Sequence, residues 1–199
     1  MTLALPIALL AGGLLAQAPR SATHDAFFQR LVAAAVDRAK VKVRYVPDYV
    51  RIPYPGGDVP ADTGVCTDEV IRVYRKLGID LQKELHEDLE ANFAAYPSKL
   101  ERPDTNIDHR RVPMIMKFFE RMGAARPITR DPADYRPGDV VAWDLLAGHV
   151  GIVVDRKDPT GARHLILHNV GQGPMIEDAL FAWPIIGHYR WAGPGTRTR

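Results

Sequence analysis

One cysteine and one histidine carry most of the chemistry that this sequence offers. Cys66 is the single cysteine of the 199 residues, and it follows the turn-prone residues 62–64 at the predicted start of a helix. A helix N-terminus presents free backbone N–H groups and the positive end of the helix dipole, which stabilise a thiolate. The same groups can hold the oxyanion of a tetrahedral intermediate. We therefore expect Cys66 to be a nucleophile; the alternative is a buried thiol on the core face of that helix.

His149 is the expected base. It lies within residues 148–153, Gly-His-Val-Gly-Ile-Val, at the start of an apolar strand, and the small glycines leave room for a substrate backbone. A third polar group must orient its imidazole. Because side chains alternate along a strand, His164 and His168 share one face of the next strand and Asn169 lies on the other. We expect His168 to orient His149, with Asn169 and His164 as its rivals.

Two neighbouring arginines are candidates for substrate binding. Arg110 and Arg111 can bind a substrate carboxylate, because Arg forms bidentate pairs with carboxylates. The alternative is a solvated loop that packs on its neighbours. A zinc site built from His149, His168 and His188 is a further alternative, but the spacing of these histidines matches no strong zinc signature. We expect no metal and no cofactor.

The spacing of apolar residues, which predicts the elements that must position these residues, changes from helical to alternating along the chain. Apolar residues at helical spacing predict helices over 24–40, 65–77 and 81–96, and a fourth that begins at Pro113 and ends at Gly123. Short β-branched or alternating runs predict strands over 139–143, 149–155, 164–170 and 185–191, with an edge strand over 41–46. Helices followed by an antiparallel sheet predict an α+β domain.

Length and composition fit one globular domain. A chain of 199 residues that is 46% hydrophobic and 25% charged can bury one hydrophobic core. We expect this domain over 23–192, followed by a flexible tail over 193–199. The formal net charge is only +2, and no dense run of Lys or Arg occurs, so we expect no nucleic-acid partner. The sequence leaves the oligomeric state open.

The beginning of the chain predicts an export signal. Residues 3–15 are apolar, uncharged and too short to span a bilayer, and residues 16–18, Ala-Gln-Ala, fit the small-x-small cleavage rule. We therefore expect a signal peptide over 1–18, a periplasmic or secreted location and no stable membrane insertion. No Lys or Arg precedes the apolar run, so an uncleaved anchor or a misplaced start codon is the alternative. In an oxidising compartment a lone thiol risks oxidation, which favours a functional reason for Cys66.

The order of motifs resembles that of the NlpC/p60 papain-like cell-wall peptidases. Those proteins carry Tyr and Gly-Gly, then Asp-Cys-Ser-Gly opening a helix, then Pro-Gly-Asp before a strand, Gly-His-Val-Gly-Ile, and a third polar residue in a following strand. The similar stretches here are 54–57, 62–66, 136–139, 148–153 and 168–171. The chain departs from the pattern where Val65 and Thr67-Asp68 flank the cysteine, in the loop over 57–66, and in an insertion over 97–112.

This resemblance implies a papain-like α+β fold, with N-terminal helices packed on a C-terminal antiparallel sheet. By position it implies Cys66 as nucleophile, His149 as base and His168 as orienter of a Cys-His-His triad, with Tyr54 assisting the oxyanion. The implied reaction is hydrolysis of an amide bond in peptidoglycan or a cell-wall peptide. Two alternatives stay open: a non-catalytic cell-wall binding module on the same fold, and an acyltransferase or amidase for another acyl substrate.

A closer resemblance is to DUF1287 (YijF-like), a family of secreted bacterial proteins of unknown function. Its members share stretches like residues 52–58, Ile-Pro-Tyr-Pro-Gly-Gly-Asp, and residues 106–113, Asn-Ile-Asp-His-Arg-Arg-Val-Pro. This closer resemblance implies a family without implying a function.

Overall fold

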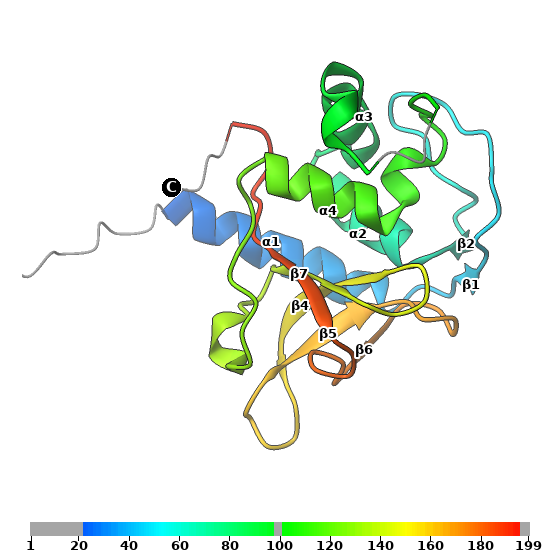
Figure 1. Cartoon of the computed structure of the whole chain (residues 1–199). Helices are drawn as coiled ribbons and strands as arrows, with labels where there is room; N and C mark the ends of the chain where they lie inside the picture. The colour runs from blue at the N-terminus through cyan, green and yellow to red at the C-terminus, as the bar shows by residue number, and fades with distance from the viewer. Residues whose placement is uncertain (1–21, 98–100, 196–199) are drawn as a thin grey trace, which may run out of the picture.

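The computed structural model describes residues 22–97 and 101–195 and has the expected α+β architecture. Within this part of the chain, four α-helices come first and a five-stranded antiparallel sheet follows them (Figure 1). The expected signal peptide over 1–18 lies outside the described residues, as do residues 196–199 of the expected tail.

The helices begin close to the expected residues. They are α1 (Ala22–Arg38), α2 (Cys66–Lys76), α3 (Leu81–Ala91) and α4 (Val112–Arg121). Asp80 caps α3, because its side chain accepts a hydrogen bond from the backbone N–H of Gln82. The third helix is shorter than the expected 81–96: the Asn92 side chain donates to the Asp88 carbonyl, the helix ends there, and a 3-10 turn, η1 (Phe93–Ala95), follows. Two further 3-10 turns are η2 (Asp108–Arg110) and η3 (Pro132–Asp134).

The main sheet has the strand order β6-β5-β4-β3-β7, and every neighbouring pair is antiparallel. The strands are β3 (Val140–Trp143), β4 (His149–Lys157), β5 (His164–His168), β6 (Met175–Glu177) and β7 (Ile185–Tyr189). The four longer strands match the sequence prediction within about two residues at each end. β6 was not predicted, because three residues are too few for an alternating pattern to stand out.

The expected edge strand over 41–46 is a two-residue strand in a separate small sheet. β1 (Arg44–Tyr45) pairs in parallel with β2 (Thr63–Gly64), and Tyr45 is opposite Gly64. Because β2 ends two residues before Cys66, this pairing holds Tyr45 close to the start of α2.

The main core lies between the helices and one face of the sheet. α1 and α2 both pack on β4. Leu31 of α1, Val70 and Val73 of α2, and Val150 and Ile152 of β4 belong to one buried apolar cluster. Removal of this apolar surface from water is the main force that joins the helical half of the chain to the sheet.

The other face of the sheet is covered by loops. Val141, Trp143 and Val153 point to this face and pack with Leu180, and the Trp143 indole donates a 2.9 Å hydrogen bond to the Leu180 carbonyl. Since side chains alternate along each strand, His149 projects to the same face as Val153.

A buried ion pair fixes the segment before α4 to α2. The Arg110 guanidinium lies 2.9 Å and 3.1 Å from the two carboxylate oxygens of Asp68. It also donates to the backbone carbonyls of Asp48 and Val46, at 2.9 Å and 3.5 Å. The Thr67 hydroxyl in turn donates to the Arg110 carbonyl at 2.9 Å. Both charged side chains are nearly fully buried, so their mutual pairing offsets the cost of desolvation.

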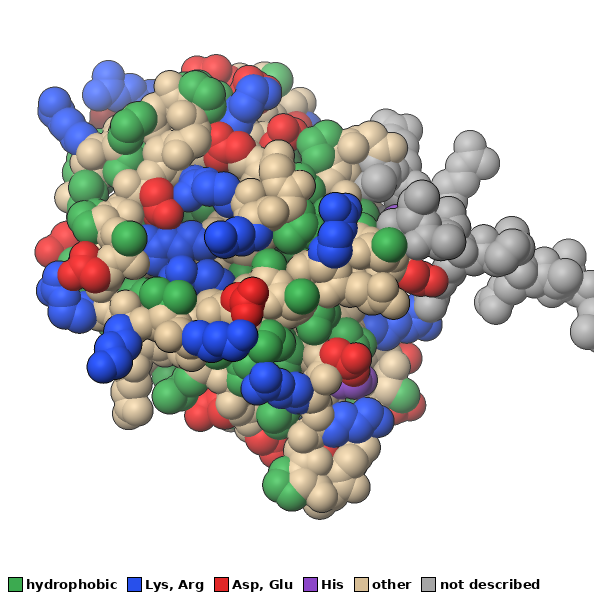
Figure 2. Space-filling view, turned by 180° about the vertical axis from the view of Figure 1, so that it is seen from behind, with side chains coloured by type: hydrophobic (Ala, Val, Ile, Leu, Met, Phe, Trp, Pro, Cys, Tyr) green, Lys and Arg blue, Asp and Glu red, His purple; other side chains and the backbone are tan. Residues whose placement is uncertain are grey.

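The surface shown in Figure 2 carries mixed charge. Lys and Arg side chains gather near the middle of this face, with Asp and Glu side chains among them. Within residues 22–97 and 101–195, no helix has both the length and the apolar character that crossing a bilayer requires.

Replacing Arg110 tests the structural importance of the ion pair. Arg110→Met leaves the Asp68 carboxylate buried without its partner, so we expect the free energy of unfolding to fall by about 3–5 kcal/mol. Arg111→Met is the matched control, because the Arg111 side chain is 41% exposed and has a single 3.3 Å ion pair with Asp108; we expect it to cost less than about 1 kcal/mol. Urea denaturation measures both, and equal losses would contradict the argument.

Candidate active site

Cys66 is the first residue of α2, and its thiol lies beside the start of β4. Backbone N–H groups of Val150, Thr67 and Cys66 itself donate hydrogen bonds to the thiol. Since Val150 follows His149 directly, this contact places the thiol next to the backbone from which the expected base projects. The structure thus brings the first turn of α2 and the start of the Gly-His-Val-Gly-Ile strand together.

Burial dominates the electrostatics of this thiol. Cys66 is 4% exposed. Burial raises the pKa of the Cys66 thiol to about 11, although the N–H groups of Val150 and Thr67 lower it; the nearby negative charge of Asp68 raises it further. The helix N-terminus therefore acts in the direction expected from the sequence, but desolvation outweighs it. At neutral pH the group is a protonated thiol.

His149, His168 and Glu177 form one chain of hydrogen bonds. His149 Nε2 lies 2.8 Å from His168 Nδ1, and His168 Nε2 lies 2.7 Å from Glu177 Oε1. Burial lowers the pKa of His149 to about 4, with a smaller contribution from His168. Burial also lowers the pKa of His168, although the Glu177 carboxylate opposes this effect. Both imidazoles are therefore neutral at pH 7.

The hydrogen-bond chain fixes which nitrogen of each ring carries the proton. A carboxylate only accepts hydrogen bonds, so His168 Nε2 carries a proton that it donates to Glu177. The neutral His168 ring then has its lone pair on Nδ1, which accepts from His149 Nε2–H. His149 is left with its lone pair on Nδ1. In this tautomer Nε2–H donates to His168, and the lone pair on Nδ1 can accept a proton, as a base requires.

Gly151 makes room for the second histidine. Extension of the β4–β5 register, in which Ile152 is opposite Leu167, sets His168 across from Gly151. A Cβ added at Gly151 would lie 2.7 Å from the Ile166 side chain and from the Leu167 carbonyl, and 3.0 Å from His168 Cβ. Because His149 projects from β4 on the same face as Gly151, the absent side chain lets the His168 ring approach it diagonally.

A cavity of about 860 Å³ opens beside the thiol. Its walls come from the segment around β1, the start of α2, the insertion over 97–112, the first turn of α4, and the turn between β3 and β4. Gly148 contributes to the wall as well as Cys66, so the cavity reaches the start of β4. A cavity of this size is typical of binding sites for small molecules.

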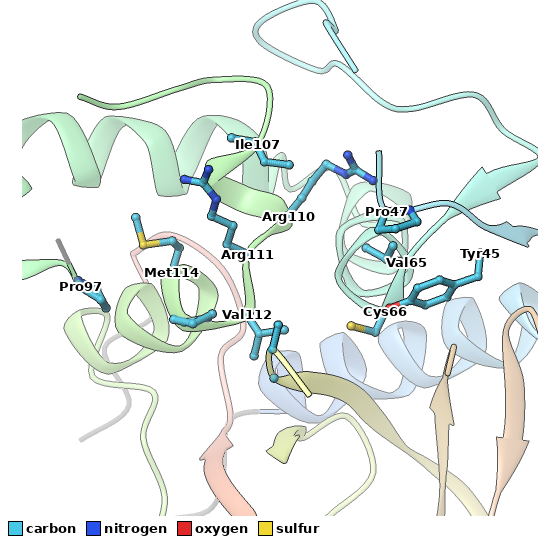
Figure 3. A pocket seen from close by; sticks show the side chains of 13 residues that line it. Tyr45, Pro47, Val65, Cys66, Pro97, Ile107, Arg110, Arg111, Val112 and Met114 are labelled. Atoms are coloured by element: carbon cyan, nitrogen blue, oxygen red, sulfur yellow. The ribbon is translucent and has the colours of Figure 1, made fainter. Parts of the chain in front are cut away.

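Tyr45, rather than the expected Tyr54, accompanies the thiol. The Tyr45 hydroxyl end points toward Cys66 in Figure 3, and Tyr45 lines the same cavity. Partial burial raises the pKa of Tyr45, and charge on Cys66 would raise it further. Tyr54 does not line this cavity, and its ring packs edge-on against His86 with 5.0 Å between ring centroids. Position in the motif indicated Tyr54, whereas the β1–β2 pairing, which brings Tyr45 here, spans too few residues to be read from sequence.

The rivals of His168 have other partners. The Asn169 side-chain oxygen accepts hydrogen bonds from the N–H groups of Gly171 and Gly173, at 3.1 Å and 3.2 Å, and so holds the loop after β5. His164 lies at the opposite end of β5, across from Lys157. The alternation argument from sequence thus separated His168 from Asn169 correctly. Glu177 was missed, because it belongs to the unpredicted strand β6.

The two arginines differ in their availability. Both line the cavity, but the Arg110 guanidinium is occupied by Asp68 and two backbone carbonyls, as described above. This pairing gives Arg110 a structural task in place of the carboxylate binding expected from sequence. Arg111 has one ion pair, with Asp108.

The three histidines considered for zinc do not share one site. His188 lies on β7, with its Nε2 2.9 Å from the Asp139 carboxylate and its Nδ1 2.9 Å from the Pro127 carbonyl. His149 and His168 are bonded to each other instead. Within the described residues, no group of three or more His, Cys, Asp or Glu side chains is arranged to hold a metal ion.

The pH dependence of alkylation tests the electrostatics of Cys66. Because burial raises the thiol pKa to about 11, we expect the rate of reaction with iodoacetamide to keep rising between pH 8 and pH 10, above the ordinary thiol pKa of about 8.5. His149→Ala should leave this profile in place, because a neutral imidazole does not stabilise the thiolate. A rate that levels off below pH 7 would show an ionised thiol and contradict the dominance of burial. Cys66 is the single cysteine, so intact mass reports its alkylation without ambiguity.

Comparison with known proteins places the chain in a family. The model of a domain of unknown function (DUF1287) matches residues 32–191, a range that includes Cys66, His149, His168 and Glu177. A curated relative, the uncharacterized protein YijF of Escherichia coli (strain K12), is 50% identical over 151 residues, which cover 74% of this chain and 73% of that protein. No solved structure matches the chain. The chain therefore belongs to the DUF1287 family, a family of unknown function.

Proposed function

We propose that this chain is a cysteine hydrolase that breaks an amide bond by acyl transfer through Cys66. One observation carries the proposal: the thiol lies beside the strand that bears His149, and His168 with Glu177 holds that histidine in the tautomer of a base. Nucleophile, base and orienting group are the three parts that cysteine catalysis requires.

In the first step, Cys66 Sγ attacks the substrate carbonyl carbon while the thiol proton passes to His149 Nδ1. An S–C bond forms, and the carbonyl oxygen becomes an oxyanion. The donors available to this oxyanion are the backbone N–H groups at the start of α2 and the Tyr45 hydroxyl. The His149 imidazolium then gives its proton to the leaving nitrogen as the C–N bond breaks, and a thioester on Cys66 remains.

In the second step, water releases the acyl group. His149 Nδ1 accepts a proton from water, a C–O bond forms at the thioester carbonyl, and the S–C bond breaks. The proton returns to Cys66 Sγ, so the enzyme recovers its starting state and the acyl group leaves as a carboxylic acid.

The neutral state of the pair determines the expected pH dependence. With the pKa of Cys66 raised to about 11 and that of His149 lowered to about 4, the proton rests on sulfur until attack. Catalysis then needs an unprotonated His149, so activity is full at neutral pH and is lost as the pH falls through the pKa of His149.

The resemblance to cell-wall peptidases favours an amide of peptidoglycan as the substrate, and the apolar residues 3–15 favour action in the periplasm or outside the cell. Both belong to the proposal. Digestion of purified peptidoglycan with mass analysis of the products tests the substrate, and fractionation of cells tests the location.

A second candidate is a binding module that keeps the fold without turnover. The protonated, buried thiol favours it, because such a thiol is a weak nucleophile. Binding to cell walls that is unchanged by Cys66→Ala, with no acyl-enzyme formed by the parent, would support this candidate against the hydrolase.

Variants of the nucleophile and the base test the hydrolase directly. With p-nitrophenyl butyrate as acyl donor, we expect Cys66→Ala to abolish turnover and His149→Ala to lower kcat by about 10²–10⁴-fold. Intact mass should detect a thioester on the parent protein. His164→Ala is the matched control, since this histidine lies on β5 outside the hydrogen-bond chain; we expect its kcat to stay within about twofold. Turnover that survives Cys66→Ala would sink the proposal.

Glu177 is expected to act as a positioning residue through His168. Glu177→Ala removes the acceptor that keeps the proton on His168 Nε2, so we expect kcat to fall by about tenfold with little change in KM. Glu177→Gln keeps an acceptor oxygen and should restore part of the loss. Asp178→Asn is the control, because Asp178 pairs with Arg163 instead. Nitrogen-15 chemical shifts of His168 should report a changed tautomer in Glu177→Ala; unchanged shifts would contradict the positioning role.

A further inference from the structure

The cavity beside Cys66 is walled mostly by apolar side chains. Its apolar wall includes Pro47, Val65, Ile107, Val112, Pro113 and Met114. Figure 3 shows Pro47 and Val65 near the thiol, Ile107 and Met114 across the cavity, and Val112 on the side to which the sulfur points. The lining, as far as the described residues form it, includes no Asp, Glu, Asn, Gln, Ser or Thr.

The polar side chains of the wall are few, and most are already engaged. The Arg110 guanidinium already pairs with the Asp68 carboxylate and donates hydrogen bonds to backbone carbonyls. Arg111 pairs with Asp108, and its guanidinium extends away from the thiol in Figure 3. The Tyr45 hydroxyl faces the thiol, where the reaction takes place. Apart from the Tyr45 hydroxyl, no side chain of the described wall has an oxygen that can accept hydrogen bonds from the ammonium and amide groups of a stem peptide.

These walls discriminate between classes of acyl group. A polar peptide in this cavity would lose its hydrogen bonds to water without replacement, at a cost for each unpaired group. An aliphatic chain would gain binding free energy, because every methylene transferred from water to an apolar wall contributes favourably. The volume of about 860 Å³ leaves room for such a chain beside the thiol.

We propose that the cavity binds the aliphatic chain of a fatty acyl group, whose carbonyl carbon is attacked by Cys66. The inference rests on the proposed function: it keeps acyl transfer through Cys66 and assigns an acyl lipid, in place of a cell-wall peptide, as the substrate. Cys66 Sγ forms a bond to the acyl carbon, the C–N or C–O bond to the head group breaks, and His149 passes the thiol proton to the departing atom. Water then cleaves the thioester and releases a fatty acid.

A series of p-nitrophenyl esters from acetate to dodecanoate tests the preference for long chains. The chromophore and the leaving group are constant, so kcat/KM reports the chain alone. Each methylene buried in an apolar wall strengthens binding by up to about fourfold. We expect kcat/KM to rise by about 100-fold or more between acetate and octanoate, with thioester formation on Cys66 seen by intact mass.

Variants of the cavity wall test whether a preference for long chains comes from binding in the cavity or from nonspecific hydrophobic attraction. Ala147 lines the cavity from an exposed position, so Ala147→Trp should fill it without disturbing the core. We expect it to lower the ratio of kcat/KM for octanoate to kcat/KM for acetate by about tenfold or more. Leu146→Trp is the matched control, because Leu146 is 97% exposed and does not line the cavity. Pro113→Asp is a second test: it places a carboxylate in the wall at the first turn of α4, where Asp is tolerated.

The outcomes distinguish the inference from the function on which it rests. Loss of the long-chain preference in Ala147→Trp and Pro113→Asp, with Leu146→Trp unchanged, supports the fatty acyl assignment. Equal kcat/KM along the series, with a thioester on Cys66 in each case, overturns the assignment and leaves the hydrolase intact. Release of peptides from peptidoglycan at a higher kcat/KM than from any ester also overturns it. Failure of every ester to acylate Cys66 overturns both.

Discussion

Helix α2 packs against strand β4, and this contact joins the helical half of the chain to the sheet. Val70 and Val73 of the helix lie in the same buried cluster as Val150 and Ile152 of the strand, and the first residue of the helix, Cys66, lies beside the beginning of β4. The hydrogen bond from the Val150 N–H to the thiol is a consequence of that packing. The candidate site therefore depends on the apolar burial behind it.

The same burial that positions the thiol also suppresses its charge. Three backbone N–H groups favour the thiolate, yet desolvation prevails and the pKa rises to about 11. The base responds to burial in the opposite sense, since desolvation lowers the pKa of His149 to about 4. Neither group then carries charge in an apolar setting, which avoids the cost of a buried ion pair before a substrate arrives. In the proposed reaction, charge develops only when the proton moves from the thiol to His149, beside donors that can stabilise the oxyanion.

Sequence periodicity was enough to predict the α+β class, the four helices and four strands of the main sheet, because each contains several apolar residues at a fixed spacing. It also set His168 and Asn169 on opposite faces of their strand. The short elements could be predicted only in part. β1 lies within the expected edge strand over 41–46, but its pairing with β2 could not be predicted, and β6 is too short to give Glu177 a periodic signal. The structural role of Arg110 depends on its ion pair with Asp68, 42 residues earlier in the chain. A contact between residues so far apart leaves no local pattern in the sequence, so this role could not be predicted.

Two departures from the cell-wall peptidase pattern contact each other in the structure: the residues that follow Cys66 bind the insertion over 97–112. Thr67 and Asp68 replace the Ser-Gly that follows the cysteine in those proteins, and the insertion over 97–112 is additional. The Thr67 hydroxyl and the Asp68 carboxylate both bind Arg110, which lies in that insertion. The residues that follow Cys66 thus hold in place the segment that supplies Ile107 to the apolar wall and leads into Val112. The apolar wall and the residues that anchor it are therefore present together in this chain, and both depart from the cell-wall peptidase pattern.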